Sequence, residues 1–227
     1  IYDLKNNNIF LLEIFPYWLH PKKGIIEYEE FLQTLYEEGL IFTFDEWMIE
    51  EVIKKIALYN QKGINIKISL NISPKHLALE HFHKYVEKTL NKYNVSGSNL
   101  YIEMVEFILK EDFQKVNYNF KKLQELGCKI IIDGFAINHS TFSVINIMNF
   151  DMIKIHRYFV ETLNEEYSSE IILLTIYKLA KEHNKKFIVE GILNEKQLEI
   201  IQNIDCQYAQ GSYFHKPQAI ENIITYM

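Results

Sequence analysis

The sequence predicts an α/β fold in which parallel strands form a barrel, and two observations support this prediction. Apolar runs of strand length alternate with amphipathic stretches of helical periodicity, a pattern typical of repeated strand–helix units. Each of seven such runs also carries a polar side chain at or near its carboxyl end. Because the functional residues of these barrels project from the carboxyl ends of the strands, we expect the polar side chains to converge on one site.

The predicted strands and their polar residues follow one another along the whole chain. Acids, amides and one amine stand at positions suited to binding a metal ion or a phosphate. The strands are predicted at residues 9–15, 64–72, 99–105, 129–135, 151–156, 186–190 and 206–214. In the same order, their polar residues are Glu13, Asn71, Glu103, Asp133, Lys154, Glu190 and Gln210.

The segments between these strands have the periodicity of helices that pack one face on a sheet. One such helix is predicted over residues 160–183. The residue that follows it, Asn184, suits the left-handed conformation that often ends a helix. Ser73 and Pro74 form the signature of an N-cap followed by a first-turn proline. Another helix is predicted over residues 109–126. Its apolar residues recur every three or four positions, namely Phe113, Val116, Phe120 and Leu123.

Length and charge limit the domain organisation and the partners. A chain of 227 residues with 48% apolar residues can fill one large domain, and no linker interrupts it, so we expect a single domain over residues 1–227. The chain begins at Ile1 with a strand-like residue, and we expect it to be part of a longer multidomain signalling protein. The net charge of -6 argues against nucleic acid as a partner, because surfaces that bind polyanions are usually basic.

Cysteine usage and hydropathy predict the cellular compartment. Cys128 and Cys206 are isolated and show no metal-ligand spacing, which favours buried free thiols over a disulfide and indicates a reducing, cytoplasmic environment. No apolar run approaches the roughly 20 residues of a membrane span, and no signal segment opens the sequence. We therefore expect no membrane contact by this domain.

Four of the strand-end residues form a set of oxygen donors. Glu13, Asn71, Glu103 and Asp133 would supply three carboxylates and one amide, which suits Mg²⁺ or Mn²⁺ and not zinc. Mutual repulsion among three carboxylates would be costly without a cation. The alternative is that residues such as Glu103 and Glu190 are acids that end a strand and face solvent.

The motifs around these residues resemble those of the EAL domain family, the bacterial cyclic di-GMP phosphodiesterases, over essentially the whole chain. In the first half the matching segments are Glu13-Ile14-Phe15 for Glu-Ala-Leu, Leu70-Asn71-Ile72-Ser73 for Val-Asn-Leu-Ser, and Glu103-Met104-Val105-Glu106 for Glu-Ile-Thr-Glu. In the second half they are Asp133-Gly134-Phe135 for Asp-Asp-Phe, Lys154-Ile155-His156 for Lys-Ile-Asp, Glu190-Gly191 within Ala-Glu-Gly, and Tyr208-Ala209-Gln210-Gly211 for Tyr-Ala-Gln-Gly.

The resemblance implies a (β/α)8 barrel of the TIM type, with an antiparallel first strand, that opens cyclic di-GMP to pGpG with two metal ions. It implies a first metal site made of Glu13, Asn71, Glu103 and Asp133. The second site would share Asp133 and add Glu190. Two further residues keep positions that the resemblance makes functional: Lys154 would contact the attacking water or a phosphate, and Gln210 would line the ligand site.

One residue of the second metal site departs from the family pattern. Gly134 stands where the family has a second aspartate, and it supplies no ligand. Because a two-metal hydrolase needs both cations to activate water, we expect one occupied Mg²⁺ or Mn²⁺ site, a second site that holds its cation weakly, and weak or absent hydrolysis. The alternative is that water or Glu106 replaces the missing carboxylate and preserves slow turnover.

Three other departures concern the neighbouring loop and the ligand. Ala136-Ile137-Asn138 replaces Gly-Thr-Gly, a loop that couples dimerisation to metal binding in active relatives, so a homodimer is also an expectation. Tyr17 replaces an arginine that reaches a phosphate; it cannot supply that charge but could stack on a guanine. His156 replaces an aspartate, and we interpret it as a hydrogen-bonded residue in the barrel mouth, with a ligand role as the alternative.

Three functions follow from these residues. The favoured one is a degenerate domain, impaired in catalysis, that serves as a cyclic di-GMP receptor or as a regulatory interaction module. The second is a working Mg²⁺- or Mn²⁺-dependent phosphodiesterase with unusual ligands. The third is a protein-interaction barrel that binds no nucleotide.

Overall fold

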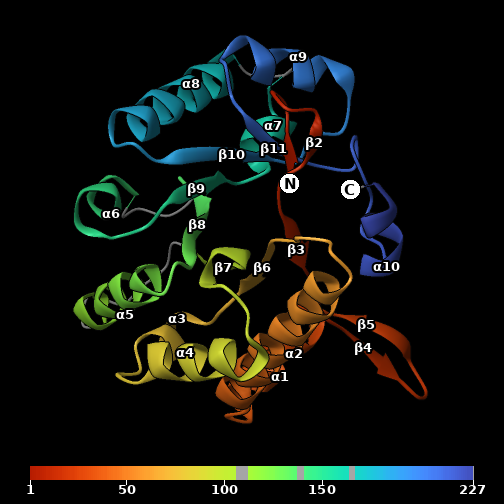
Figure 1. The fold of residues 1–227 in the computed structure, drawn as a ribbon. Coiled ribbons are helices and arrows are strands. Elements are labelled where there is room, and N and C mark those ends of the chain that lie inside the picture. The colour runs from red at the N-terminus through yellow and green to blue at the C-terminus, as the bar shows by residue number, and fades with distance from the viewer. Residues whose placement is uncertain (106–111, 137–140, 164–166, 227) are drawn as a thin grey trace. The chain divides into compact units, whose positions relative to one another are not determined.

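The computed structural model describes residues 1–105, 112–136, 141–163 and 167–226 (Figure 1). The chain divides into two compact units. We call the first the terminal unit, because it holds both chain ends in Ile1–Leu12 and Ile130–Met227. The second, the middle unit, holds Glu13–Met104 and the described residues of Ile108–Lys129, while Val105 belongs to the terminal unit.

The middle unit contains a pair of parallel strands covered by helices. Its strands are β3 (Leu12–Ile14), which begins at the border of the unit, β4 (Tyr17–His20), β5 (Gly24–Glu27), β6 (Ile68–Asn71) and β7 (Leu100–Val105). Its helices are α1 (Tyr28–Glu37), α2 (Ile41–Gln61), α3 (Pro74–Leu77), α4 (Phe82–Tyr93) and α5 (Phe113–Glu125), with a short 3-10 helix at Gly97–Asn99. Strands β6 and β7 pair in parallel, with Asn71 opposite Glu103.

Helix α2 provides much of the apolar core of the middle unit. Its residues Ile49, Ile53 and Ile56 are completely buried, and the helix packs against β6 and α4. A spacing of three or four residues places these side chains on one stripe of the helix, which explains why this stripe faces the sheet. The short helix α3 begins as predicted, because the Ser73 side chain accepts a hydrogen bond from the backbone N–H of His76.

The terminal unit contains a run of parallel strands and a short antiparallel start. Its strands are β1 (Tyr2–Asp3), β2 (Asn8–Ile9), β8 (Lys129–Phe135), β9 (Met152–Ile155), β10 (Lys186–Glu190) and β11 (Tyr208–Gln210). Its helices are α6 (Thr141–Ile147), α7 (Tyr158–Glu161), α8 (Tyr167–Glu182), α9 (Glu195–Asn203) and α10 (Ile220–Ile223), followed by a 3-10 helix at Ile224–Tyr226. Neighbours β8 to β11 pair in parallel, and α8 packs against β10 (Figure 1).

The antiparallel start of the chain is confirmed, but its strand differs from the predicted one. Strand β1 pairs antiparallel with both β11 and β2. The predicted strand over residues 9–15 is interrupted between β2 and β3, because the N–H groups of Phe10 and Leu11 both donate to the carbonyl of Ile1. The predicted helix over residues 160–183 is likewise divided into α7 and α8. Its end is as expected, since Asn184 is left-handed with φ 54°.

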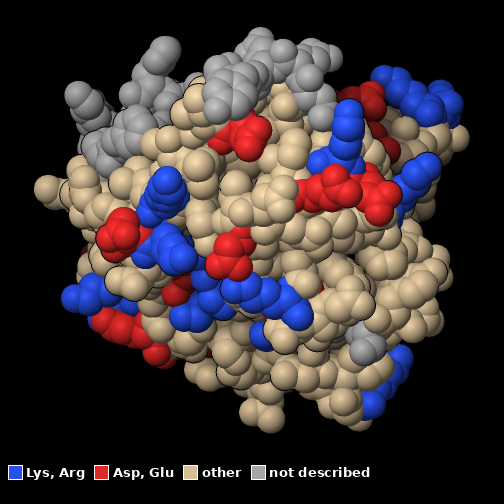
Figure 2. All heavy atoms as spheres, turned by 90° about the horizontal axis from the view of Figure 1, so that it is seen from above, with Lys and Arg blue, Asp and Glu red and all other residues tan. Residues whose placement is uncertain are grey.

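Both cysteines are buried, and the surface carries charges of both signs. Cys128 and Cys206 are buried free thiols, and burial raises the pKa of Cys206 to about 12, which keeps it protonated at neutral pH. On the face shown in Figure 2, lysine and arginine side chains lie among aspartate and glutamate side chains. Within the described residues, no helix has both the length and the apolar character that crossing a membrane requires.

Ala136, directly after β8, has an unusual backbone conformation. Its φ of 76° lies in the left-handed region, where an L-residue with a β-carbon is strained. Asparagine and aspartate adopt this region more readily, and they make up the other non-glycine residues with positive φ in the described chain, namely Asn7, Asn94, Asn184 and Asp205.

We expect Ala136→Gly to stabilise the protein because it removes this strain. The free energy of unfolding should rise by about 0.5–1 kcal/mol, measured by urea denaturation. As a control, Ala57→Gly within α2 should lower it by about 1 kcal/mol, since glycine weakens a helix interior. A loss of stability in Ala136→Gly similar to that in Ala57→Gly would show that position 136 carries no strain.

Candidate functional site

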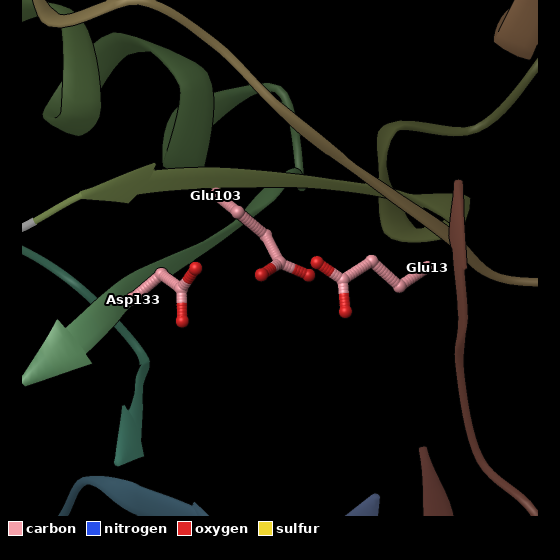
Figure 3. A group of neighbouring side chains, drawn as sticks. All are labelled: Glu13, Glu103 and Asp133. Atoms are coloured by element: carbon pink, nitrogen blue, oxygen red, sulfur yellow. The ribbon is translucent and has the colours of Figure 1, made fainter. Parts of the chain in front are cut away.

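In the middle unit, three polar side chains lie at the carboxyl ends of neighbouring strands. Glu103 on β7 is completely buried, and Asn71 on β6 stands opposite it in the strand pair. The Asn71 side-chain amide Nδ2 donates a hydrogen bond of 3.2 Å to Oε1 of Glu13, which extends from β3. In Figure 3 the carboxyl groups of Glu13 and Glu103 point toward one another, and their nearest oxygens lie within 4.8 Å.

This pair of carboxylates is unfavourable without a compensating charge. Two like charges about 4 Å apart repel by about 4 kcal/mol at the effective dielectric constant of a protein surface. Burial of Glu103 adds the cost of removing a charged group from water. A divalent cation offsets both terms, and carboxylate and amide oxygens are the donors that Mg²⁺ and Mn²⁺ favour. Glu13, Asn71 and Glu103 therefore fit a cation of this class.

In the terminal unit, four polar residues lie at the carboxyl ends of consecutive parallel strands. Lys154 on β9 is only 1% exposed, and its Nζ lies 3.6 Å from Oδ1 of Asp133 on β8. Glu190 on β10 stands opposite Gln210 on β11. The carbonyl of Gln210 accepts hydrogen bonds from the N–H groups that follow Glu190, at Gly191 and Ile192. The short distance between Lys154 and Asp133 shows that the buried lysine is charge-paired with this carboxylate.

Gly134 lies in an irregular part of β8. The pairing with β9 shifts register between Ile132 and Phe135, which is typical of a β-bulge. Gly134 itself has a φ of 66°, and its N–H donates a 2.8 Å hydrogen bond to Oδ1 of Asp133. Among the described residues, the chain neighbours of Gly134 excepted, no atom lies within 4 Å of a β-carbon added at this position. Gly134 therefore offers Asp133 its backbone N–H and carries no carboxylate of its own.

The remaining predicted residues have different surroundings. Tyr17 is 58% exposed on β4, in the two-stranded sheet with β5. The Nδ1 atom of His156 accepts the N–H of Tyr158 at 3.2 Å, which agrees with the interpretation of His156 as a hydrogen-bonded residue. Glu106, and the loop positions 137 and 138, lie outside the described residues.

One polar cluster near Asn71 was not predicted from the sequence. Asp45 on α2 is 1% exposed and accepts hydrogen bonds from Ser73 and His76, which follow β6. The available signal was weak: Asp45 is an acid on an otherwise apolar stripe of α2 that includes Ile41, Met48 and Ile49. Its partners could not be identified, since they lie about 30 residues further along the chain.

The sequence matches the EAL domain family over residues 1–217. Cyclic di-GMP phosphodiesterase PdeA of Borreliella burgdorferi is 30% identical over 183 residues, which cover 80% of this chain and 27% of that protein. Cyclic di-GMP phosphodiesterase PdeR of Escherichia coli is 26% identical over 206 residues, which cover 91% of this chain and 31% of that protein. The chain thus spans about a third or less of the length of these relatives.

Solved structures show the same fold. The PaMucR phosphodiesterase in complex with c-di-GMP superposes with a TM-score of 0.91 and 25% identity, covering 98% of this chain and 90% of that one. The FimX EAL domain of Pseudomonas aeruginosa, bound to c-di-GMP, has a TM-score of 0.87 and 22% identity, covering 96% of this chain and 87% of that one. These similarities confirm the predicted α/β barrel of the TIM type. With the match over residues 1–217, they show that the chain belongs to the EAL domain family.

Proposed function

We propose that this EAL domain binds cyclic di-GMP at the carboxyl ends of its strands, together with one divalent cation, and that it hydrolyses the nucleotide poorly. Nucleotide binding is supported by the relatives named as cyclic di-GMP phosphodiesterases and by the c-di-GMP complexes of PaMucR and FimX. The observation that carries the loss of hydrolysis is Gly134, which supplies no carboxylate beside Asp133, where the family pattern has a second aspartate.

The proposed cation site is built on Glu13, Asn71 and Glu103 of the middle unit. The family pattern assigns Asp133 to the same site as a fourth oxygen donor for Mg²⁺ or Mn²⁺. The close approach of Glu13 and Glu103 supports this site, since a bound cation would offset their repulsion. When bound, such a cation polarises a phosphate oxygen and lowers the pKa of a bound water.

In this proposal the second cation position is weak because residue 134 supplies no carboxylate. The Oδ1 atom of Asp133 accepts the N–H of Gly134 and lies near the ammonium group of Lys154. These two neighbours leave Asp133 less negative charge to offer to a second cation, so the position needs another carboxylate. Glu190 is then the main remaining ligand for a second cation, and it would hold that cation weakly. The charge of Lys154 compensates Asp133 and holds its orientation.

Two further residues act on the nucleotide. Gln210, at the end of β11, lines the ligand site through its side-chain amide. Tyr17 offers no cation to a phosphate where an arginine would form charge-assisted hydrogen bonds, each worth about 1.5–3 kcal/mol. The affinity for the nucleotide is accordingly lower than with an arginine at this position. This division into cation-binding and nucleotide-binding residues describes a receptor more than an efficient hydrolase.

The proposed setting is a larger signalling protein. The relatives are about three to four times longer than the part that this chain matches, which supports the expectation that the chain is one domain of a longer polypeptide. In that setting the domain would report cyclic di-GMP to neighbouring domains by binding it.

An active phosphodiesterase is the second candidate, and a specific observation favours it. All seven strand-end residues lie at or near the carboxyl ends of β3, β6 and β7 in one unit and of β8 to β11 in the other. Such a site retains slow turnover if water or Glu106 completes the second set of ligands.

Calorimetry with cyclic di-GMP tests the proposed function. Titrations are made in Ca²⁺, which takes the same oxygen ligands but supports less water activation, and in EDTA. We expect the nucleotide to bind in both conditions, with a lower dissociation constant in Ca²⁺ than in EDTA. In Asp133→Asn the ratio of these two dissociation constants should be at least tenfold smaller. If the nucleotide bound neither in Ca²⁺ nor in EDTA, the result would contradict the proposal and favour an interaction barrel. Rapid formation of pGpG in Mn²⁺ would instead favour the active enzyme.

A further inference from the structure

Asp45 forms a buried hydrogen-bond centre at the carboxyl end of β6. Its Oδ2 accepts the backbone N–H of Ser73 at 3.2 Å, the Ser73 hydroxyl at 2.8 Å and Nδ1–H of His76 at 3.1 Å. Asp45 and His76 are 1% and 2% exposed. Three donors on one buried carboxylate oxygen tie helix α2 to the turn between β6 and α3.

This centre acts next to Asn71, which lies two residues before Ser73. The intervening residue, Ile72, donates its N–H to the carbonyl of Glu103 at 2.9 Å. The backbone that follows Asn71 is therefore fixed from two sides, by β7 through Ile72 and by α2 through Ser73. A rigid backbone at this point holds the Asn71 side chain in reach of Glu13, to which it donates a hydrogen bond.

The surroundings of Asp45 are poor in water. Burial, and after it the negative charge of Asp45, raises the pKa of Tyr28 and of Tyr36, whose side chain is hydrogen-bonded to Ser73. The ring of His76 lies between Phe42 and Phe82, with ring centroids 5.1 and 4.8 Å away. These apolar neighbours exclude water, so the donors on Asp45 are not easily replaced by solvent.

We propose that Asp45 is a positioning residue for the cation site: it fixes the β6–α3 turn through Ser73 and His76 and thereby sets the position of Asn71 relative to Glu13. The proposal rests on the proposed function, in which Asn71 and Glu13 bind the cation. Asp45 itself touches neither the nucleotide nor the cation. Its effect on cation affinity arises because a ligand misplaced by even about 1 Å binds less well.

A matched control is available at the other end of the same strand pair. Asn99, just before β7, is also buried, and its Nδ2 donates to the Asn65 side chain and to the Ile66 carbonyl, both at 2.6 Å. Asp45→Asn and Asn99→Asp are isosteric changes, and each weakens or removes buried hydrogen bonds of the replaced side chain. Both should lower the urea midpoint of unfolding, but only Asp45 lies beside Asn71.

The experiment compares the two variants by NMR and by Mn²⁺ calorimetry. The Asn71 side-chain NH₂ signals, assigned with Asn71→Ser, should shift in Asp45→Asn and stay unchanged in Asn99→Asp, without any cation. Mn²⁺ affinity should fall about tenfold in Asp45→Asn and by less than twofold in Asn99→Asp. If Asp45→Asn does not fold, Ser73→Ala, which removes one of the three donors, takes its place in both measurements.

The outcomes separate this inference from the proposed function. Unchanged Asn71 signals and equal Mn²⁺ affinities in the two variants would overturn the positioning role and leave Asp45 with a purely structural one. Failure of the unaltered protein to bind Mn²⁺ would contradict the proposed function. In that case the Asn71 signals still decide whether Asp45 sets the position of this side chain.

Discussion

Replacing Gly134 with aspartate is expected to raise the Mn²⁺-dependent hydrolysis of cyclic di-GMP by about 100-fold, which corresponds to ~2.7 kcal/mol of the activation barrier. The reason is that Gly134→Asp restores the aspartate that the family pattern has beside Asp133, which in our proposal supplies a ligand for a second cation. Two cations together activate the attacking water and stabilise the leaving oxygen better than one. Formation of pGpG, followed by chromatography, measures the gain.

The structure permits this substitution. In the described part of the chain, the neighbours of Gly134 excepted, no atom lies within 4 Å of a β-carbon built on Gly134, so the β-carbon itself meets no steric obstacle there. Its φ of 66° costs an L-residue roughly 1 kcal/mol, although aspartate adopts this region more readily than most residues. We therefore expect a folded variant with a slightly lower melting temperature and a higher rate.

Gly134→Asn is the matched control for charge. Asparagine has the same shape and tolerates the same backbone conformation, but its neutral amide binds a divalent cation much less strongly. Its turnover should stay within about threefold of the unaltered protein, against about 100-fold for the aspartate, if a missing charge is the cause. An equal and small effect of both substitutions, with cation binding intact, would shift the defect to Tyr17 or to the loop that follows β8.

The second large effect is expected for Glu103→Gln. The substitution keeps the shape of a completely buried side chain and removes its charge. Without a cation the variant should be more stable, because the repulsion with Glu13 and the burial of a charge both disappear. With Mn²⁺ at 100 times its dissociation constant, the unaltered protein should gain about 2.7 kcal/mol of stability, a gain that Glu103→Gln should lose.

Thermal unfolding in EDTA and in Mn²⁺ measures both parts of this prediction. Glu87→Gln, an exposed change on α4, serves as the control and should respond to Mn²⁺ as the unaltered protein does. The prediction is wrong if Glu103→Gln is destabilised in EDTA by a few kcal/mol, since the carboxylate would then have hydrogen bonds that outweigh its repulsion. It is also wrong if the variant keeps its full stabilisation by Mn²⁺.

The sequence predicted those parts of the fold that depend on local pattern. Strand β8 could be recognised because Ile130, Ile131 and Ile132 form a continuous apolar run, which is typical of a strand buried on both faces of a parallel sheet. The strand-end positions of Asn71 and Glu103 followed from the ends of such runs. These features are determined by a few adjacent residues, so they can be predicted from sequence.

Other features depend on tertiary contacts and could not be predicted in the same way. The hairpin of β4 and β5 has an exposed face, with Trp18, Leu19 and Ile25 at least half exposed, and so lacks the alternation that marks a strand. The centre at Asp45 joins residues that are distant in sequence. At Gly134 the missing carboxylate was evident from the sequence, but the β-bulge and the donation to Asp133 were not.

Native mass spectrometry of the nucleotide complex tests the central claim most directly, because it counts cations and weighs the nucleotide in one measurement. After incubation with Mn²⁺ and cyclic di-GMP, we predict one Mn²⁺ ion per chain and an intact cyclic nucleotide, with the cation lost in Glu103→Gln. A complex with two Mn²⁺ ions per chain and the mass of pGpG would contradict the claim that Gly134 has left this EAL domain with a single cation site.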